Sequence, residues 1–157
     1  MPLWHIYCPE GTYSPEDKRA LADRITGLYA EYGLPRFLVS VVFQEVPKDS
    51  YLIGGEPADD YVRIWIDQIA RRIPDDARGW WMKRIRETVA PYATDRDLRW
   101  EVHVDDTPRE LWSVDGRKPP VEGSEEEQRW ARRSRRGTRA RPPGFLGESV
   151  ELGAAAS

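Results

Sequence analysis

The chain has 157 residues, of which 39% are hydrophobic and 32% are charged, a balance typical of one globular domain. Its formal net charge of −3 argues against a general polyanion-binding protein, and its one cysteine, Cys8, excludes an internal disulfide. Two histidines without a helical His/Glu pairing argue against a metal site. No apolar run approaches the roughly 20 residues that cross a bilayer, and no basic-then-apolar leader is present. We therefore expect a cytoplasmic protein with no membrane partner.

The first half of the chain predicts a strand, a helix and a second strand. Residues 2–8 alternate and are rich in β-formers, which is typical of a strand. Residues 14–17 (Ser-Pro-Glu-Asp) are a strong helix start, and Gly33 ends the helix. The residues at helical spacing between them are Leu21, Ile25, Leu28 and Tyr32. Residues 37–46 form a nearly continuous apolar run, which favours a strand buried on both faces.

The same order of elements recurs after a polar connection that contains Gly54 and Gly55. Residues 61–67 and 98–104 predict two more strands. Between them, Asp75 or Asp76 is expected to cap a second helix. The inner stripe of that helix is Trp81, Ile85, Val89 and Tyr92.

These two half-repeats, at about residues 2–47 and 61–104, predict a two-layer α/β (α+β) fold. Fused β-α-β units form a four-stranded sheet with both helices on one face. The other face of the sheet stays uncovered, which predicts burial against partner subunits; an ordinary monomeric α/β sandwich is the alternative. Short helices are expected from Thr107 through Trp112 and from Ser124 to Trp130, which completes a domain over residues 1–130.

A proline directly after the initiator methionine, opening the first of two fused strand-helix-strand units, resembles the tautomerase superfamily. Within this superfamily, the chain resembles the branch of cis-3-chloroacrylic acid dehalogenase, above all the tautomerase-like proteins of unsettled activity in that branch. The resemblance rests on residues 43–45 (Phe-Gln-Glu), the Gly54-Gly55 pair and residues 100–112 (WEVHVDDTPRELW). The resemblance covers about residues 2–130.

The resemblance implies a homotrimer of two-unit subunits with no cofactor, in which Pro2 is the catalytic acid or base. It also implies arginines that bind a small substrate carboxylate near the end of the third strand. Arg72 matches the first arginine position, with Arg71 beside it, whereas Asp75 occupies the second.

Other positions of the dehalogenases are replaced in this chain. Tyr29 stands where they have a first-helix histidine, and His103 stands where they have a fourth-strand tyrosine. Their water-activating glutamate matches Val114, with Asp115 one place away. These departures argue against true dehalogenation and leave the proline chemistry untouched. Tyr29, His103 and Asp115 are the candidate catalytic residues beside Pro2. Alternation along residues 98–104 allows His103 either to face the site, where it could relay a proton, or to be exposed.

Removal of Met1 leaves Pro2 as a secondary amine, and a free α-amino group has a pKa of about 7.7–8. Burial or nearby guanidinium groups lower it further, which makes the nitrogen a general base near neutral pH. The leading hypothesis is tautomerisation of a small 2-keto or enol acid. A hydratase or dehalogenase on a three-carbon unsaturated acid, or a decarboxylase on a β-keto acid, is the alternative on the same site. A non-catalytic binding protein that retains the fold is the alternative of another class.

The C-terminal segment, residues 131–157, matches no known family. Together with the end of the domain it carries many arginines: Arg129, Arg132, Arg133, Arg135, Arg136, Arg139 and Arg141. Such a run can neutralise phosphates, but no nucleic-acid-binding motif accompanies it. We expect a solvated, disordered or subunit-crossing tail and no nucleic-acid partner.

Overall fold

The computed structural model describes residues 2–69, 72–114 and 116–134. Its strands are β1 (Leu3–Pro9), β2 (Ser40–Val46), β3 (Leu52–Ile53), β4 (Glu56–Pro57), β5 (Tyr61–Ile69) and β6 (Arg99–Thr107). Its α-helices are α1 (Pro15–Glu31), α2 (Arg78–Val89) and α3 (Glu125–Ser134). Short 3₁₀ turns lie at Arg36–Leu38, Lys48–Ser50, Asp75–Ala77, Ala90–Tyr92, Thr94–Arg96 and Arg109–Leu111.

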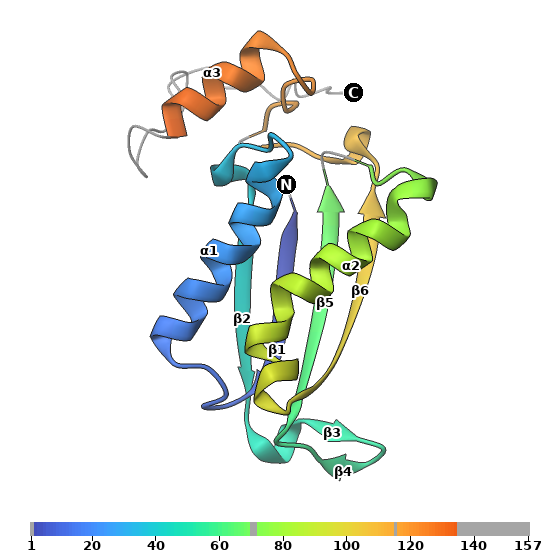
Figure 1. Cartoon of the computed structure of the whole chain (residues 1–157). Helices are drawn as coiled ribbons and strands as arrows, with labels where there is room; N and C mark the ends of the chain where they lie inside the picture. The colour runs from blue at the N-terminus through green and yellow to red at the C-terminus, as the bar shows by residue number, and fades with distance from the viewer. Residues whose placement is uncertain (1, 70–71, 115, 135–157) are drawn as a thin grey trace, which may run out of the picture.

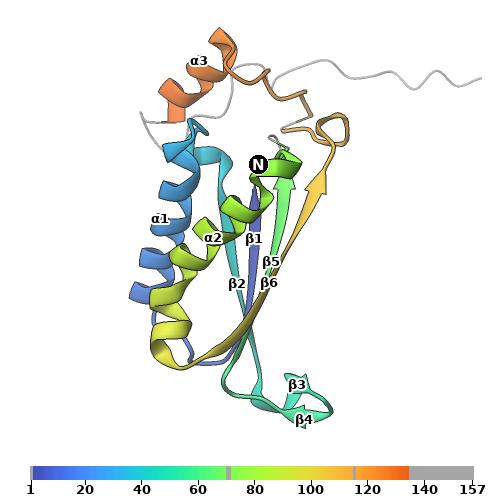
Figure 2. The same ribbon diagram turned by 45° about the vertical axis from the view of Figure 1, so that its right-hand side comes forward.

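The four long strands form one sheet in the order β2-β1-β5-β6. β1 and β2 are parallel, β5 and β6 are parallel, and the two pairs meet antiparallel at β1 and β5. Each parallel pair needs a crossover, which α1 and α2 supply on the same face of the sheet (Figure 1, Figure 2). The predicted fold of two fused β-α-β units is therefore confirmed.

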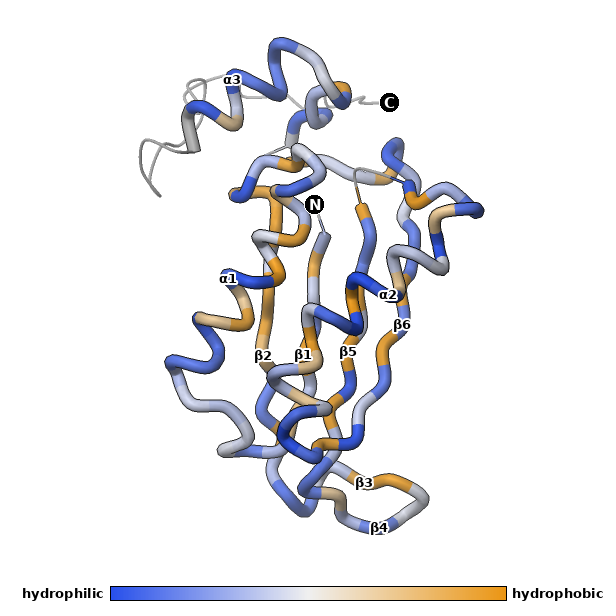
Figure 3. Tube along the Cα trace, in the orientation of Figure 1, coloured by the Kyte–Doolittle hydropathy of each residue, from blue (hydrophilic) through white to orange (hydrophobic). Residues whose placement is uncertain are grey.

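The core lies between the two helices and the sheet. α1 begins with the predicted capping box, since Ser14 Oγ accepts from the Asp17 N–H and the Asp17 carboxylate accepts from the Ser14 N–H, both at 3.1 Å. The buried helix residues are Leu21, Ile25, Leu28, Tyr29, Trp81, Ile85 and Val89. They pack on every second residue of the two central strands, and hydrophobic and polar positions alternate along β5 and β6 (Figure 3).

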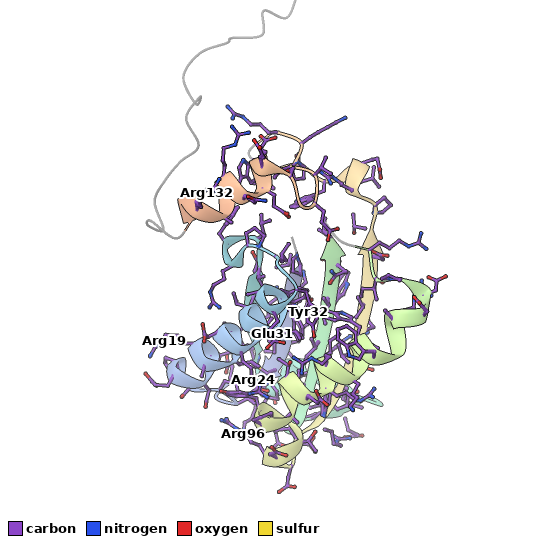
Figure 4. All side chains as sticks on the ribbon, turned by 45° about the horizontal axis from the view of Figure 1, so that its top comes forward. Arg19, Arg24, Glu31, Tyr32, Arg96 and Arg132 are labelled. Atoms are coloured by element: carbon purple, nitrogen blue, oxygen red, sulfur yellow. The ribbon has the colours of Figure 1, made fainter. Side chains whose placement is uncertain are left out.

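Arginines fix the two helices relative to each other. Arg24 of α1 donates from Nε to the Thr88 carbonyl and from Nη2 to the Glu87 carbonyl, both at 3.0 Å. These carbonyls belong to the last turn of α2, where a positive charge is stabilised by the helix dipole. Arg96 pairs with Asp17 at the start of α1 at 2.7 Å (Figure 4). The first half of α1 is thereby joined to the last turn of α2 and to the 3₁₀ turn that follows it.

The second strand differs from its prediction. Pro35 leads into a 3₁₀ turn, so β2 starts at Ser40 instead of residue 37. The expectation that this strand is buried on both faces is wrong for the single chain, because β2 is an edge strand and Val42 is 40% exposed. Its apolar run reflects packing on one side only, where Val41 and Phe43 contact the core.

Two connections also differ from their predictions. Ala77 is the N-cap of α2 and no side chain caps it; Asp75 lies one 3₁₀ turn earlier and pairs with Arg78 at 2.9 Å. The connection between the halves contains the β3–β4 hairpin, whose turn residues Gly54 and Gly55 have φ angles of 64° and 90°. Left-handed angles at both positions are those of a tight two-residue hairpin turn.

The sheet face opposite the helices is uncovered in the described chain (Figure 2). The strand register aligns His5, Trp65 and His103 in one row across it, with ring centroids 5.4 and 5.6 Å apart. Among the described residues, no helix has the length and apolar character that a membrane crossing requires.

Candidate active site

Pro2 lies at the edge of the sheet where β1 and β2 begin and β5 and β6 end (Figure 1). Its ring is fully buried, and its carbonyl accepts a hydrogen bond from the Ser40 N–H at 3.0 Å. Leu3 pairs with Asp67, so the antiparallel register continued by one residue sets Pro2 beside Gln68. Alternation along β1 puts Pro2 on the helix-covered side, together with Trp4.

A buried hydrogen-bonded chain links this edge to α1. Trp4 Nε1 donates to Tyr29 Oη at 3.0 Å, and Tyr29 Oη donates to Gln68 Oε1 at 3.1 Å. Tyr29 and Gln68 are each 4% exposed. Burial holds the pKa of Tyr29 well above its usual value of 10, so the hydroxyl stays protonated and keeps donating at neutral pH. Tyr29 therefore contacts the residue that neighbours Pro2.

Arg72 follows β5 at the same edge of the sheet. Its Nε lies 3.7 Å from Asp106 Oδ2, and its Nη2 lies 3.8 Å from Asp75 Oδ1. Asp106 is the register partner of Gln68 on β6, so Pro2, Gln68 and Asp106 form one row. Arg72 itself is 74% exposed and lines an open hollow of about 450 Å³ with Pro74, Asp75 and Asp76.

Gln68 and Asp106 are candidate site residues that the sequence did not reveal. Gln68 continues the apolar phase of β5, after Val62, Ile64 and Ile66, all of which are buried. A polar residue in that phase is the signal that could have found it, because buried polar groups occur where a hydrogen-bond partner is present. Asp106 carries no comparable signal, since only the strand register brings it into the row.

His103 is not brought together with Pro2 in the single chain. It lies three residues before Asp106 on β6, so alternation puts it on the opposite, uncovered face, where it stacks on Trp65 at 5.6 Å. The remaining predicted site residues, Arg71 and Asp115, lie outside the described residues, as does the arginine-rich segment beyond Ser134.

Neither metal nor thiol chemistry is indicated in the part of the chain that the structure describes. No group of three or more His, Cys, Asp or Glu side chains there could hold a metal ion. Cys8 is fully buried, and burial raises the pKa of its thiol to about 11, so it is protonated at neutral pH. The candidate site therefore combines Pro2, the buried phenol of Tyr29, the buried amide of Gln68 and the pairing of Arg72 with Asp106.

The fold and this site define a tautomerase-type protein. The chain belongs to the family described as "Putative oxalocrotonate tautomerase enzyme", whose model matches residues 1–135. The predicted membership of the tautomerase superfamily is thereby confirmed.

Solved structures agree with this assignment. A probable enzyme from Aspergillus fumigatus is 40% identical, with 85% of this chain and 94% of that chain covered and a TM-score of 0.80. RhCC from Rhodococcus jostii RHA1 is 38% identical, with 83% and 95% covered and a TM-score of 0.79. N1, a member of the cis-3-chloroacrylic acid dehalogenase family, shares the fold at 22% identity, with 82% and 89% covered and a TM-score of 0.65. No curated protein sequence matches the chain.

Proposed function

We propose that this protein is a cofactor-independent enzyme that interconverts the keto and enol forms of a small 2-keto acid through the amine of Pro2. The observation that supports it best is the position of Pro2, whose fully buried ring begins the strand beside Gln68 and its partner Tyr29. Removal of Met1 frees the nitrogen at that edge. Arg72, with Arg71 next to it in sequence, binds the substrate carboxylate.

In the proposed reaction the neutral Pro2 nitrogen removes the proton of the enol hydroxyl. The double bond moves from carbon–carbon to carbon–oxygen, and the same proton is delivered to the adjacent carbon. Burial and the Arg72 guanidinium both disfavour a charged nitrogen, whereas the Asp106 carboxylate favours it. Because Asp106 pairs with Arg72, the two charges offset each other at this edge. The Tyr29 hydroxyl orients Gln68, which contacts the substrate oxygen.

The uncovered sheet face supports a homotrimer as the working form. It carries the His5, Trp65 and His103 row, and an aromatic row of this kind is typical of a subunit interface. One solved structure of a fused 4-OT protein, 22% identical, is described as an asymmetric trimer. Light scattering is expected to give three times the 18.2 kDa chain mass. In such an assembly His103 acts at the interface; a monomer in solution would contradict this part of the proposal.

Three alternatives use the same fold. Hydration or dehalogenation of an unsaturated three-carbon acid requires an activated water, a role for Asp115. Decarboxylation of a β-keto acid requires only the carboxylate site and the amine. A binding protein without catalysis is favoured by one observation, the pairing of Asp75 with Arg72, because Asp75 competes with a substrate carboxylate.

The test compares the wild type with Pro2→Ala after mass spectrometry of the purified protein. We expect Met1 to be absent, and we expect Pro2→Ala to ketonise the enol form of a 2-keto acid about 100-fold more slowly. Pro9→Ala is the matched control, because Pro9 is equally buried at the other end of β1, and it should keep its activity if folded. Retained Met1, or equal rates in wild type and Pro2→Ala, would refute the proposal.

Parallel assays separate the alternatives. Halide release from a cis-3-haloacrylate that depends on Pro2 indicates the hydratase or dehalogenase, and Pro2-dependent carbon dioxide release from a β-keto acid indicates the decarboxylase. A folded protein that turns over none of these acids supports the binding protein.

A further inference from the structure

The C-terminal part of the described chain crosses the end of the sheet at which Pro2 lies. β6 ends at Thr107 on one edge of the sheet, whereas α3 contacts the 3₁₀ turn Arg36–Leu38, which precedes β2 on the opposite edge. Residues 116–134 therefore pass over the strand ends between these two edges (Figure 1, Figure 2). We refer to residues 116–134 as the strap.

The strap is attached to the rest of the domain near both of its ends. Near its start, Arg109 Nη2 donates to the carbonyl of Pro119, and Pro119 is buried. Near its other end, the ring of Trp130 contacts the ring of Phe37, with 6.1 Å between the centroids. This distance lies within the range of favourable aromatic pairs. The strap is therefore joined to the end of β6 and to the start of β2.

The attachment at α3 is narrow. Trp130 is the one large apolar residue in the sequence of α3, and the other residues of the helix are charged, polar or small. Phe37 remains 39% exposed although it contacts Trp130. A segment with so little buried apolar surface opens at a low free-energy cost. α3 can move as a unit, because Ser124 Oγ accepts from the Glu127 N–H at 3.2 Å and Glu127 Oε2 accepts from the Gly123 N–H at 2.8 Å.

A ligand of Pro2 requires such an opening. The ring of Pro2 is fully buried, so a ligand reaches it only when the chain around it moves. The Ser40 N–H, which bonds the Pro2 carbonyl at 3.0 Å, comes three residues after Phe37 in the sequence. The attachment of α3 therefore lies at the same edge of the sheet as the candidate active site.

From these contacts we propose that the strap is a lid over the Pro2 edge, which is closed by the contact of Trp130 with Phe37 and opens when that contact breaks. The lid controls the access of any ligand to Pro2, so the inference goes beyond the proposed function and does not depend on the reaction. It predicts that a weaker contact exposes Pro2 without unfolding the domain.

The test measures access to position 2 with a thiol probe in the full chain. Pro2→Cys places a thiol at the buried position, and its alkylation by iodoacetamide is followed by peptide mapping, which separates it from the buried Cys8. Addition of Trp130→Ala is expected to raise the rate of alkylation about tenfold. Addition of Trp130→Phe, which keeps a ring against Phe37, should leave the rate within about twofold of that in Pro2→Cys alone.

Gln128→Ala is the matched control, because Gln128 is an exposed residue of the same helix, and it should not change the rate. Equal alkylation with and without Trp130→Ala would overturn the inference, and so would an equal rise with Gln128→Ala. A thiol that reacts as fast in folded Pro2→Cys as in the urea-unfolded protein would also overturn it, because the closed strap would then give no protection.

Hydrogen exchange read by mass spectrometry locates the motion. In the Trp130→Ala variant the amides of α3 are expected to exchange about tenfold faster than in the wild type, while those of β1 and β5 keep their rates. Unchanged exchange in α3, or an equal rise in α3 and β5, would overturn the inference. Neither measurement requires turnover. If Pro2→Ala keeps full activity while both lid measurements give the expected result, the proposed function fails and the lid stands.

Discussion

Tyr29→Phe removes one oxygen atom from the buried chain that joins the sheet to α1. In the native protein that oxygen accepts from Trp4 Nε1 at 3.0 Å and donates to Gln68 Oε1 at 3.1 Å. The phenyl ring still fills the site between Trp4 and Trp81, at centroid distances of 6.5 and 5.2 Å. The substitution therefore changes hydrogen bonding far more than packing.

The expected loss follows from two broken buried hydrogen bonds. A buried group that loses its partner costs about 1–3 kcal/mol, and Trp4 is 0% exposed, so water cannot replace the partner. We expect the free energy of unfolding to fall by about 2–4 kcal/mol. A domain of this size is stable by about 5–15 kcal/mol, so the variant should remain folded.

Urea unfolding followed by tryptophan fluorescence measures this loss. Tyr32→Phe, directly after the same helix, is the comparison: Tyr32 is 42% exposed, so water can replace the Arg84 side chain as the partner of its hydroxyl, and the cost should stay below about 1 kcal/mol. In the double variant with Trp4→Phe the costs should fall short of additivity, since both substitutions break the same bond. A Tyr29→Phe cost within about 0.5 kcal/mol, or strict additivity, would refute the reasoning.

Two further predictions concern a thiol and a helix end. Burial raises the pKa of Cys8 from 9.0 to about 11, so the thiol ionises at a lower pH in the unfolded chain than in the folded one. The stability that this difference contributes is present below pH 9 and is lost as the pH rises towards 11. Cys8→Ala should lack this part of the alkaline loss in thermal melts, and an identical loss in both proteins would contradict the prediction. Arg24→Met removes two hydrogen bonds and a positive charge from the C-terminal carbonyls of α2. The free energy of unfolding should fall by about 1–2 kcal/mol, and Arg24→Lys should recover part of this loss. An Arg24→Met variant as stable as the wild type in urea would exclude this role.

Most of the elements could be predicted from the sequence because their signals are local. The capping box at Ser14 and Asp17 and the apolar spacing along α1 act within a few residues, and both appear in the structure. The repeated order of strand, helix and strand likewise predicted the sheet with two helices on one face. The prediction that Asp75 or Asp76 caps α2 was wrong. Aspartate is a good capping residue, but Asp75 belongs to the preceding 3₁₀ turn and pairs with Arg72 and Arg78 instead.

Features that depend on pairing between distant strands could not be predicted. Alternation along residues 98–104 could not decide which face of the sheet carries His103. The register with Trp65 puts it on the uncovered face. The run at residues 37–46 gave no sign that β2 is an edge strand, because edge and central strands differ in their neighbours and not in their local pattern.

Pro2 illustrates the division between sequence and tertiary structure. Its place at the start of a strand follows from the first residues of the chain, because strand-forming residues begin directly after it. Its neighbours Gln68 and Asp106 follow from the antiparallel meeting of β1 and β5 and the parallel pairing of β5 and β6. Those registers are selected by burial of the whole helix-covered face, since a shift of one residue would turn every core side chain outward. The sequence therefore determined that a proline stands directly before this strand, and the tertiary structure decided which groups surround it.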